Sequence, residues 1–235
     1  MFQGKSVALV IPALDEEEAL PPLLARVDRR IVDRLVVADN GSRDGTAGAA
    51  RRAGALVVTE PRRGYGSACL AGIRAAGPVD ILAFMDGDGS DDPAELPRVL
   101  APLVEGRADL VIGSRVLGGA EKGALTFTQR FGNALTCRLV RLFWGVRFTD
   151  LGPFRALTRE ALERLEMADP DYGWTIEMQV KAVRLGMKVL EVPVSRKIRR
   201  GGRSKVTGNP AASFLAGKRI LGYVLAAKLG EIFRR

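Results

Sequence analysis

The sequence contains no histidine and only two cysteines. Without histidine, no Ser-His-Asp or Cys-His nucleophile can form, and zinc sites built on imidazole are excluded as well. Cys69 and Cys137 lie far apart and show no CxxC spacing, which argues against a disulfide framework or a thiolate metal site. We interpret both cysteines as small core residues of a protein in a reducing cytoplasm.

Long hydrophobic runs are also missing from the 235 residues. No segment has the ~18 uninterrupted apolar residues that a membrane-spanning helix needs. The N-terminus lacks the charged start and the long apolar stretch of a signal peptide. We therefore expect a cytoplasmic protein whose contact with a membrane is peripheral. A hydrophobic share of 47% is enough for one folded domain with a buried core.

Positive charge is concentrated at the C-terminal end of the chain. Eleven lysine and arginine residues and one acid lie in 196–235, which gives this segment a charge of +10. The whole chain has a net charge of +9, so residues 1–195 have a net charge of −1. Such a block indicates a partner that carries phosphate: a nucleotide, a lipid phosphate, an anionic membrane or a nucleic acid. We expect no nucleic acid, because no aromatic residues are interleaved with these charges.

Short apolar runs alternate with helical patterns along the first half of the chain. The predicted strands cover 6–12, 34–38, 56–59, 81–85 and 110–113. The predicted helices cover 15–30, 46–53 and 64–76, and Pro93 opens a further one. The second half adds helices over 126–143, 173–186 and 211–233 and a strand over 188–193. The alternation predicts an α/β fold, a mostly parallel sheet flanked by helices.

Polar and charged residues follow four of the predicted strands. Parallel sheets bind ligands outside the carboxyl ends of their strands, where such residues can converge. The residues at these positions are Pro12–Glu16, Asp39, Asp86, Asp88, Ser114 and Arg115. The sequence therefore predicts a ligand site at this edge of the sheet.

The turn after the fourth predicted strand carries carboxylates at positions 86, 88, 91 and 92. Asp86 and Asp88 can aim at one point, and two carboxylates that close repel each other unless a cation lies between them. Oxygen ligands favour Mg²⁺ or Mn²⁺, which commonly bridge to phosphate oxygens. The alternative is a solvated turn that caps the next helix. An EF-hand is excluded, because Pro97 stands where its loop needs glutamate.

The loop after the first predicted strand reads PALDEEE and is acidic rather than glycine-rich. Neither the dinucleotide fingerprint nor the Walker A motif is present, which disfavours a hydride-transferring Rossmann enzyme. Asp39 ends the second strand, and an acid at that place commonly binds a ribose or a base edge.

Residues 126–143 form an amphipathic pattern with apolar side chains at a spacing of four. The stripe consists of Phe127, Phe131, Leu135, Leu139 and Phe143, with Arg130, Arg138 and Arg141 close to it or flanking it. Arginines along an apolar face are typical of a helix in a membrane interface, where long side chains reach back to water. A helix packed on the domain would give the same pattern, and both interpretations stay open.

Several motifs occur together in an order and spacing that resemble one enzyme family. They are VIPALDEEE, VVADNGSRDGT, RRGYGSACLAGIRAA, the DGD turn, GSR, the D-x-x-x-F-R of 150–155 and EVPVSRKIRRGGRSK. Over about residues 5–209 the chain resembles family-2 glycosyltransferases of the GT-A fold. It is most similar to their polyprenyl-phosphate sugar synthases, the dolichyl-phosphate mannose synthase type. The resemblance implies a GT-A fold with a basic, amphipathic C-terminal extension.

The resemblance also implies roles for individual residues. The nucleotide-sugar would be bound by Pro12, Leu14, Glu16, Asp39, Asp86, Gly87, Asp88, Arg115, Arg199 and Lys205. The acceptor phosphate would be bound by Arg115, Arg130, Arg199 and Lys205. The metal, Mg²⁺ or Mn²⁺, would be bound by Asp86, Asp88 and Asp91, the last because Ser90 stands where the family usually has an amide. Of these residues, we expect Asp88 and Arg115 to be catalytic, and we add Glu177 as a candidate base from the chemistry of the reaction rather than from the resemblance.

The residues and the resemblance together predict a metal-dependent inverting glycosyltransferase. It would move mannose or glucose from GDP-mannose or UDP-glucose to a polyprenyl phosphate, of dolichyl or undecaprenyl type, at a membrane surface. A phosphate oxygen is already ionised near neutral pH, so this reaction needs no general base. A hydroxyl acceptor would need one, and Glu177 and Asp88 are the candidates; the alternative role for Glu177 is an ion pair with Lys181.

Two functions from other classes compete with this prediction. A nucleotidyltransferase usually holds its triphosphate with a glycine-rich basic first loop, which the acidic PALDEEE contradicts. A non-catalytic membrane-surface module would have little use for Asp39, Asp86 and Asp88 together. We expect 1–195 to form the catalytic domain, with the interface-type helix at about 124–147, and 196–235 to add a basic loop and a helix to the same unit.

Overall fold

The computed structural model describes residues 1–199 and 210–232 of the chain. Its centre is a seven-stranded sheet in the order β3-β2-β1-β4-β6-β5-β7. The strands are β1 (Val7–Ala13), β2 (Arg34–Asp39), β3 (Leu56–Thr59), β4 (Ile81–Phe84), β5 (Leu110–Ser114), β6 (Arg155–Thr158) and β7 (Val189–Pro193). Strand β6 runs antiparallel to β4 and β5, and the other pairings are parallel. The predicted α/β fold with a mostly parallel sheet is thereby confirmed.

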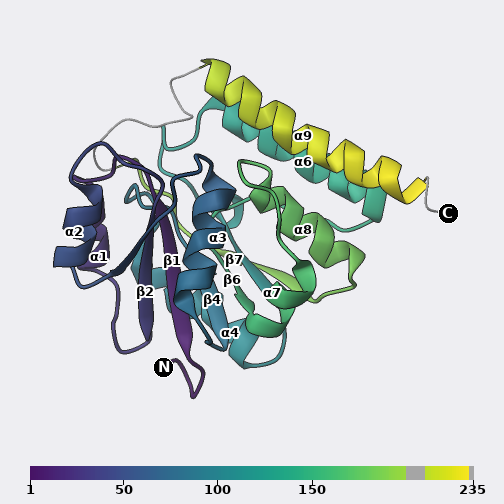
Figure 1. Cartoon of the computed structure of the whole chain (residues 1–235). Helices are drawn as coiled ribbons and strands as arrows, with labels where there is room; N and C mark the ends of the chain where they lie inside the picture. Colours follow the sequence, from purple (N-terminus) through teal and green to yellow (C-terminus); the bar gives the residue numbers. More distant parts are fainter. Residues whose placement is uncertain (200–209, 233–235) are drawn as a thin grey trace.

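Helices cover both faces of this sheet (Figure 1). They are α1 (Leu20–Leu24), α2 (Thr46–Arg52), α3 (Tyr65–Ala76), the 3-10 turn η1 (Pro93–Glu95), α4 (Leu96–Val104), α5 (Arg115–Gly118), α6 (Phe127–Trp144), α7 (Arg159–Leu165), α8 (Trp174–Arg184) and α9 (Pro210–Ile232). Helices α6 and α9 lie side by side, and both also pack against α8. The predicted C-terminal helix is therefore present and rests on the body of the protein.

Strand β1 shows how the sequence builds two cores at once. All seven of its residues are buried, and successive side chains point to opposite faces of a sheet. Leu9 and Ile11 join the layer with α1 and α4, whereas Val10 joins the layer with α3 and α8. A side chain buried in this way contributes roughly 1.5–3 kcal/mol to stability. The unbroken apolar run thus places β1 in the middle of the sheet.

The first helix is much shorter than the pattern at 15–30 predicts, since α1 has only five residues. Proline fits only the first turn of a helix, and Pro21 and Pro22 therefore keep the helix from starting much earlier. Asp15 has a positive φ of 50°, and the amide of Glu16 donates to Thr46 Oγ1 instead of entering a helix. The acidic loop therefore lies outside the helix, at the end of β1.

Strand β6 and helix α7 have no counterpart among the predicted elements. Strand β6 has four residues, too few for a visible alternation of apolar and polar side chains. Helix α7 begins at a cap that sequence rules recognise, because Thr158 accepts a hydrogen bond from the amide of Ala161. Strand β6 completes the sheet between β4 and β5, and its first residue, Arg155, pairs with Phe84 near the predicted site.

Helix α6 combines features of both interpretations of its sequence. Cys137 and Val140 are buried against the neighbouring helices, and Cys69 of α3 is also buried, in line with the expected core role of both cysteines. Phe127 and Phe131 at the start of α6 are 83% and 60% exposed. No helix in the described ranges 1–199 and 210–232 is long and apolar enough to cross a membrane.

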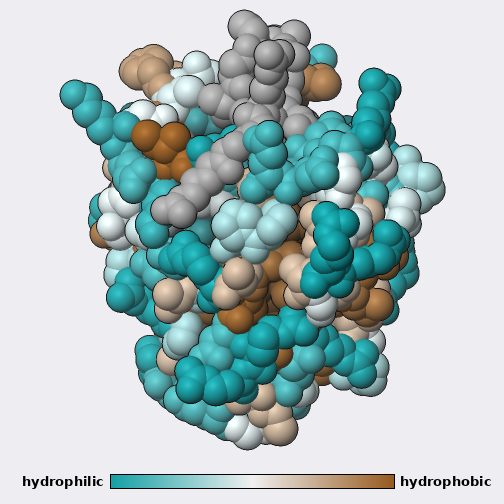
Figure 2. Space-filling view, turned by 90° about the vertical axis from the view of Figure 1, so that its left-hand side faces the viewer, coloured by the Kyte–Doolittle hydropathy of each residue, from teal (hydrophilic) through white to brown (hydrophobic). Residues whose placement is uncertain are grey.

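The face of the molecule that carries α1 and α2 is mainly hydrophilic, with apolar residues near its middle (Figure 2).

Candidate active site at the carboxyl ends of the strands

The acidic turn after β4 is held in shape by its own side chains. The amide of Asp86 donates to Asp91 Oδ2 at 3.2 Å, and Tyr65 Oη lies 3.4 Å from Asp86 Oδ1. The amide of Ser90 donates to Asp88 Oδ1 at 3.1 Å, and its hydroxyl makes a second, short bond to the same oxygen. The carboxylates of Asp86 and Asp88 remain 22% and 15% exposed at the site. The turn therefore presents two partly accessible carboxylates in fixed positions.

Two arginines from the segment after β7 reach into this turn. Arg196 lies 2.8 Å from Asp91 Oδ1, 3.3 Å from Asp86 Oδ2 and 3.8 Å from Asp88 Oδ2. Arg199 lies 3.3 Å from Asp88 Oδ2 and makes a short ion pair with Glu16. Residues more than a hundred positions apart thus form one charged cluster at the ends of β1, β4 and β7.

Burial and neighbouring charges set the protonation of this cluster. Burial raises the pKa of Asp86 to about 7, and Asp91 and Asp88 add to the rise, while Arg196 and Arg115 oppose it. Burial alone would lower the pKa of Arg196, but Asp91, Asp86 and Asp88 outweigh it and raise this pKa. Arg196 therefore stays charged, and Asp86 depends on nearby cations to stay ionised.

The ends of β1 and β2 form the other side of the site. Pro12 pairs in register with Ala38, one residue before Asp39. Asp39 is 6% exposed and accepts a hydrogen bond from the amide of Ser42 at 3.2 Å. A Cβ added at Gly87 would lie 3.2 Å from the carbonyl oxygen of Pro12, so the acidic turn packs directly on the end of β1. The residues expected to hold a nucleotide are thereby brought next to the carboxylates.

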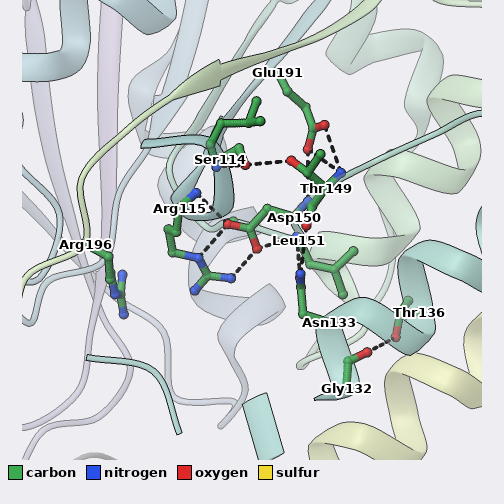
Figure 3. Close-up of polar contacts among 12 residues, drawn as sticks. Ser114, Arg115, Gly132, Asn133, Thr136, Thr149, Asp150, Leu151, Glu191 and Arg196 are labelled. Atoms are coloured by element: carbon green, nitrogen blue, oxygen red, sulfur yellow. Dashed lines mark hydrogen bonds and ion pairs between the residues drawn. The ribbon is translucent and has the colours of Figure 1, made fainter. Parts of the chain in front are cut away.

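Arg115 at the end of β5 is fixed by a buried aspartate (Figure 3). Its Nε and Nη2 donate to the two carboxylate oxygens of Asp150 at 2.8 and 2.6 Å, and its amide donates to the same side chain. Asp150 is 1% exposed and Arg115 14% exposed. A bidentate pair of this kind fixes both the position and the plane of a guanidinium. Arg196 lies on the same side of the site in this view, and its positive charge acts to lower the pKa of Arg115, against the larger effect of Asp150.

A second layer of hydrogen bonds holds Asp150 in turn. Glu191 of β7 accepts from the amides of Thr149 and Asp150 at 2.9 to 3.0 Å. Asn133 of α6 donates to the carbonyl of Thr149 and accepts from the amide of Leu151, both at 2.9 Å. The orientation of Arg115 is therefore coupled to α6, the helix with exposed phenylalanines.

The arginines and the acidic turn form a candidate site for anionic ligands and a cation, near the point between β1 and β4 where the strand order reverses. Comparison with known proteins identifies the family. The sequence model described as glycosyl transferase family 2 matches residues 8–166. The chain belongs to glycosyl transferase family 2. An uncharacterized glycosyltransferase of Mycobacterium tuberculosis is 41% identical over 214 residues, which cover 91% of this chain and 95% of that protein.

Relatives of this glycosyltransferase include enzymes with more specific names. An undecaprenyl-phosphate mannosyltransferase of Micrococcus luteus is 31% identical, with 86% of this chain and 88% of that protein covered. A polyprenol monophosphomannose synthase of Mycolicibacterium smegmatis is 32% identical, with 86% and 81% covered. Among solved structures, glucosyl-3-phosphoglycerate synthase of Mycobacterium tuberculosis, in complex with Mn²⁺, UDP-glucose and phosphoglyceric acid, has a TM-score of 0.77. It is 25% identical and covers 96% of this chain and 80% of that one.

The carboxylates of the glycosyltransferase fit a divalent cation that is shared with a substrate. Mg²⁺ is commonly held by one or two carboxylates together with phosphate oxygens and water, and Asp86 and Asp88 supply two. Across residues 1–199 and 210–232, no group of three or more acidic, cysteine or histidine side chains is placed to hold a metal ion. Asp91, expected as a third ligand, is buried and uses its two oxygens for the amide of Asp86 and for Arg196. Its position favours the role of an anchor for Arg196.

Glu177 differs most from its expected role as a catalytic base. Its carboxylate is 3% exposed, accepts hydrogen bonds from the amides of Ala168 and Asp169, and lies 2.9 Å from Lys181. These contacts tie the start of α8 to the segment before it. The ion pair with Lys181, the alternative that the spacing left open, is the one that forms, so we assign Glu177 a structural role.

The other expected residues fall into three groups. Leu14, Glu16, Gly87, Asp88 and Arg199 lie with the acidic turn or on the loop after β1. Arg130 is exposed on α6, three residues before Asn133, which hydrogen-bonds the segment that holds Asp150. Lys205 lies outside the described residues.

Two residues of this site were given no role from the sequence. Asp150 belongs to a quoted motif, but nothing in its spacing reveals that it holds Arg115. Arg196 is one of four cations in the run RKIRR, and only the fold shows that its side chain faces the acidic turn. Charge patterns locate a block, whereas individual roles depend on where the backbone after β7 is fixed.

Proposed function

We propose that this glycosyltransferase moves a hexose, with mannose favoured, from a nucleoside-diphosphate sugar to a polyprenyl phosphate. The observation that carries the proposal is the meeting of a two-carboxylate turn with three arginines, Arg115, Arg196 and Arg199, at one edge of the sheet. Such a site suits two phosphate-bearing substrates at once. The names of the two relatives at 31% and 32% identity support a polyprenyl phosphate acceptor and mannose.

The donor would lie across the ends of β1, β2 and β4. Asp39, at the end of β2, would accept hydrogen bonds from the sugar or base of the nucleotide, with Pro12, Leu14 and Glu16 alongside. Asp86 and Asp88 would hold a divalent cation, Mg²⁺ or Mn²⁺, against the diphosphate. When bound, such a cation stabilises the negative charge that develops on a leaving diphosphate. Arg196 and Arg199 add positive charge to the same place.

The acceptor would be met by Arg115. Because Asp150 occupies two of its nitrogens, the guanidinium is held in one plane and can present its remaining N–H groups to a phosphate. A phosphate oxygen is ionised near neutral pH and can attack the anomeric carbon directly, with inversion. This chemistry needs no general base, in accord with a sequence without histidine and with the structural role of Glu177. Arg130 and Lys205 are further candidates for the acceptor phosphate.

A lipid acceptor requires the site to lie at a membrane surface, and we propose that α6 and α9 make this contact. Phe127 and Phe131 are exposed at the start of α6, with their rings 6.4 Å apart. Phe214 and Leu215, near the start of α9, are 74% and 57% exposed. Arg130, on the same part of α6, would stay in the headgroup layer. Attachment would be peripheral.

The proposal is tested by transfer of labelled sugar into a lipid product. The purified protein is incubated with Mn²⁺, undecaprenyl phosphate in detergent, and either GDP-[³H]mannose or UDP-[³H]glucose. We expect label in the organic phase, and Asp88→Asn should reduce it at least a hundredfold. Asp92→Asn is the matched control, because it removes the same charge from the same turn at a residue that pairs with Arg26 and Lys197. No lipid-soluble label with either donor would reject the proposed acceptor.

A further inference from the structure

Arg196 occupies an unusual position for a residue of a basic surface segment. Its side chain is 11% exposed and faces three carboxylates, with the closest contact to Asp91. One atom, Nη2, lies 3.3 Å from Asp86 Oδ2 and 3.8 Å from Asp88 Oδ2. The guanidinium thus lies close to both partly exposed carboxylates of the acidic turn, those of Asp86 and Asp88, and shares its positive charge between them.

The backbone around Arg196 is fixed on both sides. Its amide donates to the carbonyl of Gly119 at 3.2 Å, and its carbonyl accepts from the amide of Glu121 at 2.9 Å. The next amide, of Lys197, donates to the carbonyl of Ser90 at 2.8 Å. Since the main chain is tied to the acidic turn itself, the guanidinium can change partners only by rotating its side chain within the site.

One donor of Arg196 is left over. Its Nε–H is buried and has no hydrogen-bond partner among the residues that the structure describes. A buried donor without a partner costs roughly 1–3 kcal/mol, so an acceptor that reaches it binds favourably. With a nucleoside diphosphate bound as proposed, the natural acceptor is a phosphate oxygen.

These contacts place Arg196 and a divalent cation in competition. Two like charges repel strongly at a few ångströms in a partly buried site, where the effective dielectric constant is about 20 rather than 80. A cation bound by Asp86 and Asp88 would meet the guanidinium that pairs with the same two oxygens. A diphosphate relieves this repulsion, because it brings negative charge and oxygens that can accept from Arg196.

We propose that Arg196 is a built-in counter-ion that holds Asp86 and Asp88 until metal and diphosphate arrive together, and that it then turns to the diphosphate. Asp91 keeps the guanidinium close to the site during this exchange. The inference rests on the proposed use of a metal and a nucleotide-sugar, and it makes the binding of the two cooperative. The cation would bind weakly without nucleotide, which keeps the site from being filled by metal alone.

The test is the affinity for Mn²⁺ alone, measured from the electron paramagnetic resonance signal of the free ion during titration of the full chain. Arg196→Gln should bind Mn²⁺ at least tenfold more tightly than the wild type, a change of about 1.4 kcal/mol. Lys197→Gln is the matched control, since it removes the same charge from the neighbouring residue, whose partner is Asp92. Its affinity should stay within twofold of the wild type.

The second measurement repeats the titrations with saturating GDP and UDP. In the wild type the matching nucleotide should raise the affinity for Mn²⁺ strongly, and in Arg196→Gln this gain should shrink at least fivefold. Arg196→Lys keeps the charge but cannot span the three carboxylates, and we expect an intermediate affinity. An ion pair with a merely structural role predicts lower thermal stability and an unchanged affinity for Mn²⁺.

Unchanged or weaker binding of Mn²⁺ by both Arg196 variants, in protein that keeps its circular dichroism, would overturn the inference. The same holds if wild type and variants all fail to bind Mn²⁺. Failure of the proposed function looks different, because it is the absence of sugar transfer to lipid. The binding results can hold in that case, since they require no acceptor.

Discussion

The substitution Asp150→Asn isolates the part of the site that orients Arg115. Asparagine keeps the size of the side chain and one oxygen acceptor, but it removes the charge and one of the two acceptors that bind Arg115 Nε and Nη2. Arg115 itself is unchanged in the variant. The variant therefore asks whether the plane and position of this guanidinium matter, separately from its presence.

The size of the effect follows from the burial of the pair. Loss of one partner of a buried ion pair costs about 3–5 kcal/mol. Arg115 is 14% exposed and can recruit some water, and asparagine retains part of the bonding, so we expect about 2–3 kcal/mol less unfolding free energy. A displacement of reacting groups by about 1 Å costs roughly 100-fold in rate. We therefore expect kcat for sugar transfer to fall about 100-fold, with less than a threefold change in the KM of the donor.

The assay is steady-state transfer of labelled hexose to undecaprenyl phosphate, at a temperature where the variant is folded by circular dichroism. Asp80→Asn is the matched control, because Asp80 accepts hydrogen bonds from Ser6 and lies at the opposite end of β4. It should lose stability but keep its kcat. A kcat of Asp150→Asn within threefold of the wild type would refute the positioning role.

Three further predictions concern stability, membrane contact and ligands. Burial would raise the pKa of Asp92, but bonds from Arg26 and Lys197 lower it far below normal, so this stabilisation is full above about pH 4 and is lost as the pH falls further. Urea unfolding should thus give Asp92→Asn a deficit of about 1–2 kcal/mol at pH 7 that is clearly smaller at pH 2; an equal deficit at both values would contradict this. Phe127→Ser with Phe131→Ser should weaken co-sedimentation with anionic vesicles at least tenfold and leave the melting temperature within about 2 °C; unchanged co-sedimentation would exclude this face as the contact. Mn²⁺ with the matching nucleoside diphosphate, at 100 times its Kd, should add ~2.7 kcal/mol of stability in a thermal-shift assay; no shift with any of GDP, UDP, dTDP or CDP would contradict the donor class.

Local sequence rules succeeded where one physical constraint dominates. The apolar run of β1 and the residues after β2, β4 and β5 predicted that the candidate residues gather at one edge of the sheet, and they do, because parallel strands bring their carboxyl ends together. The two prolines at the start of α1 were visible in the sequence and could have corrected the helix predicted over 15–30. Strand β6 is too short to carry a pattern of its own, and its antiparallel pairing depends on partners far along the chain.

Roles that depend on contacts over long distances in the sequence were out of reach. Glu177 had a plausible partner at spacing four, but its burial against the amides of Ala168 and Asp169 became visible only in the fold. Arg196 faces inward because backbone bonds to Gly119, Glu121 and Ser90 fix the segment after β7. A block of positive charge in the sequence does not show which of its side chains will face the acidic turn.

The most direct test of the account is a competition between two acceptors in one reaction. Undecaprenyl phosphate and 3-phosphoglycerate are offered together with GDP-mannose or UDP-glucose and Mn²⁺, and the products are identified by mass spectrometry. The account predicts a hexosyl undecaprenyl phosphate that is labile to mild acid, formed in equal amount with the released nucleoside diphosphate. Sugar found only on phosphoglycerate would contradict it and would make a hydroxyl oxygen the nucleophile.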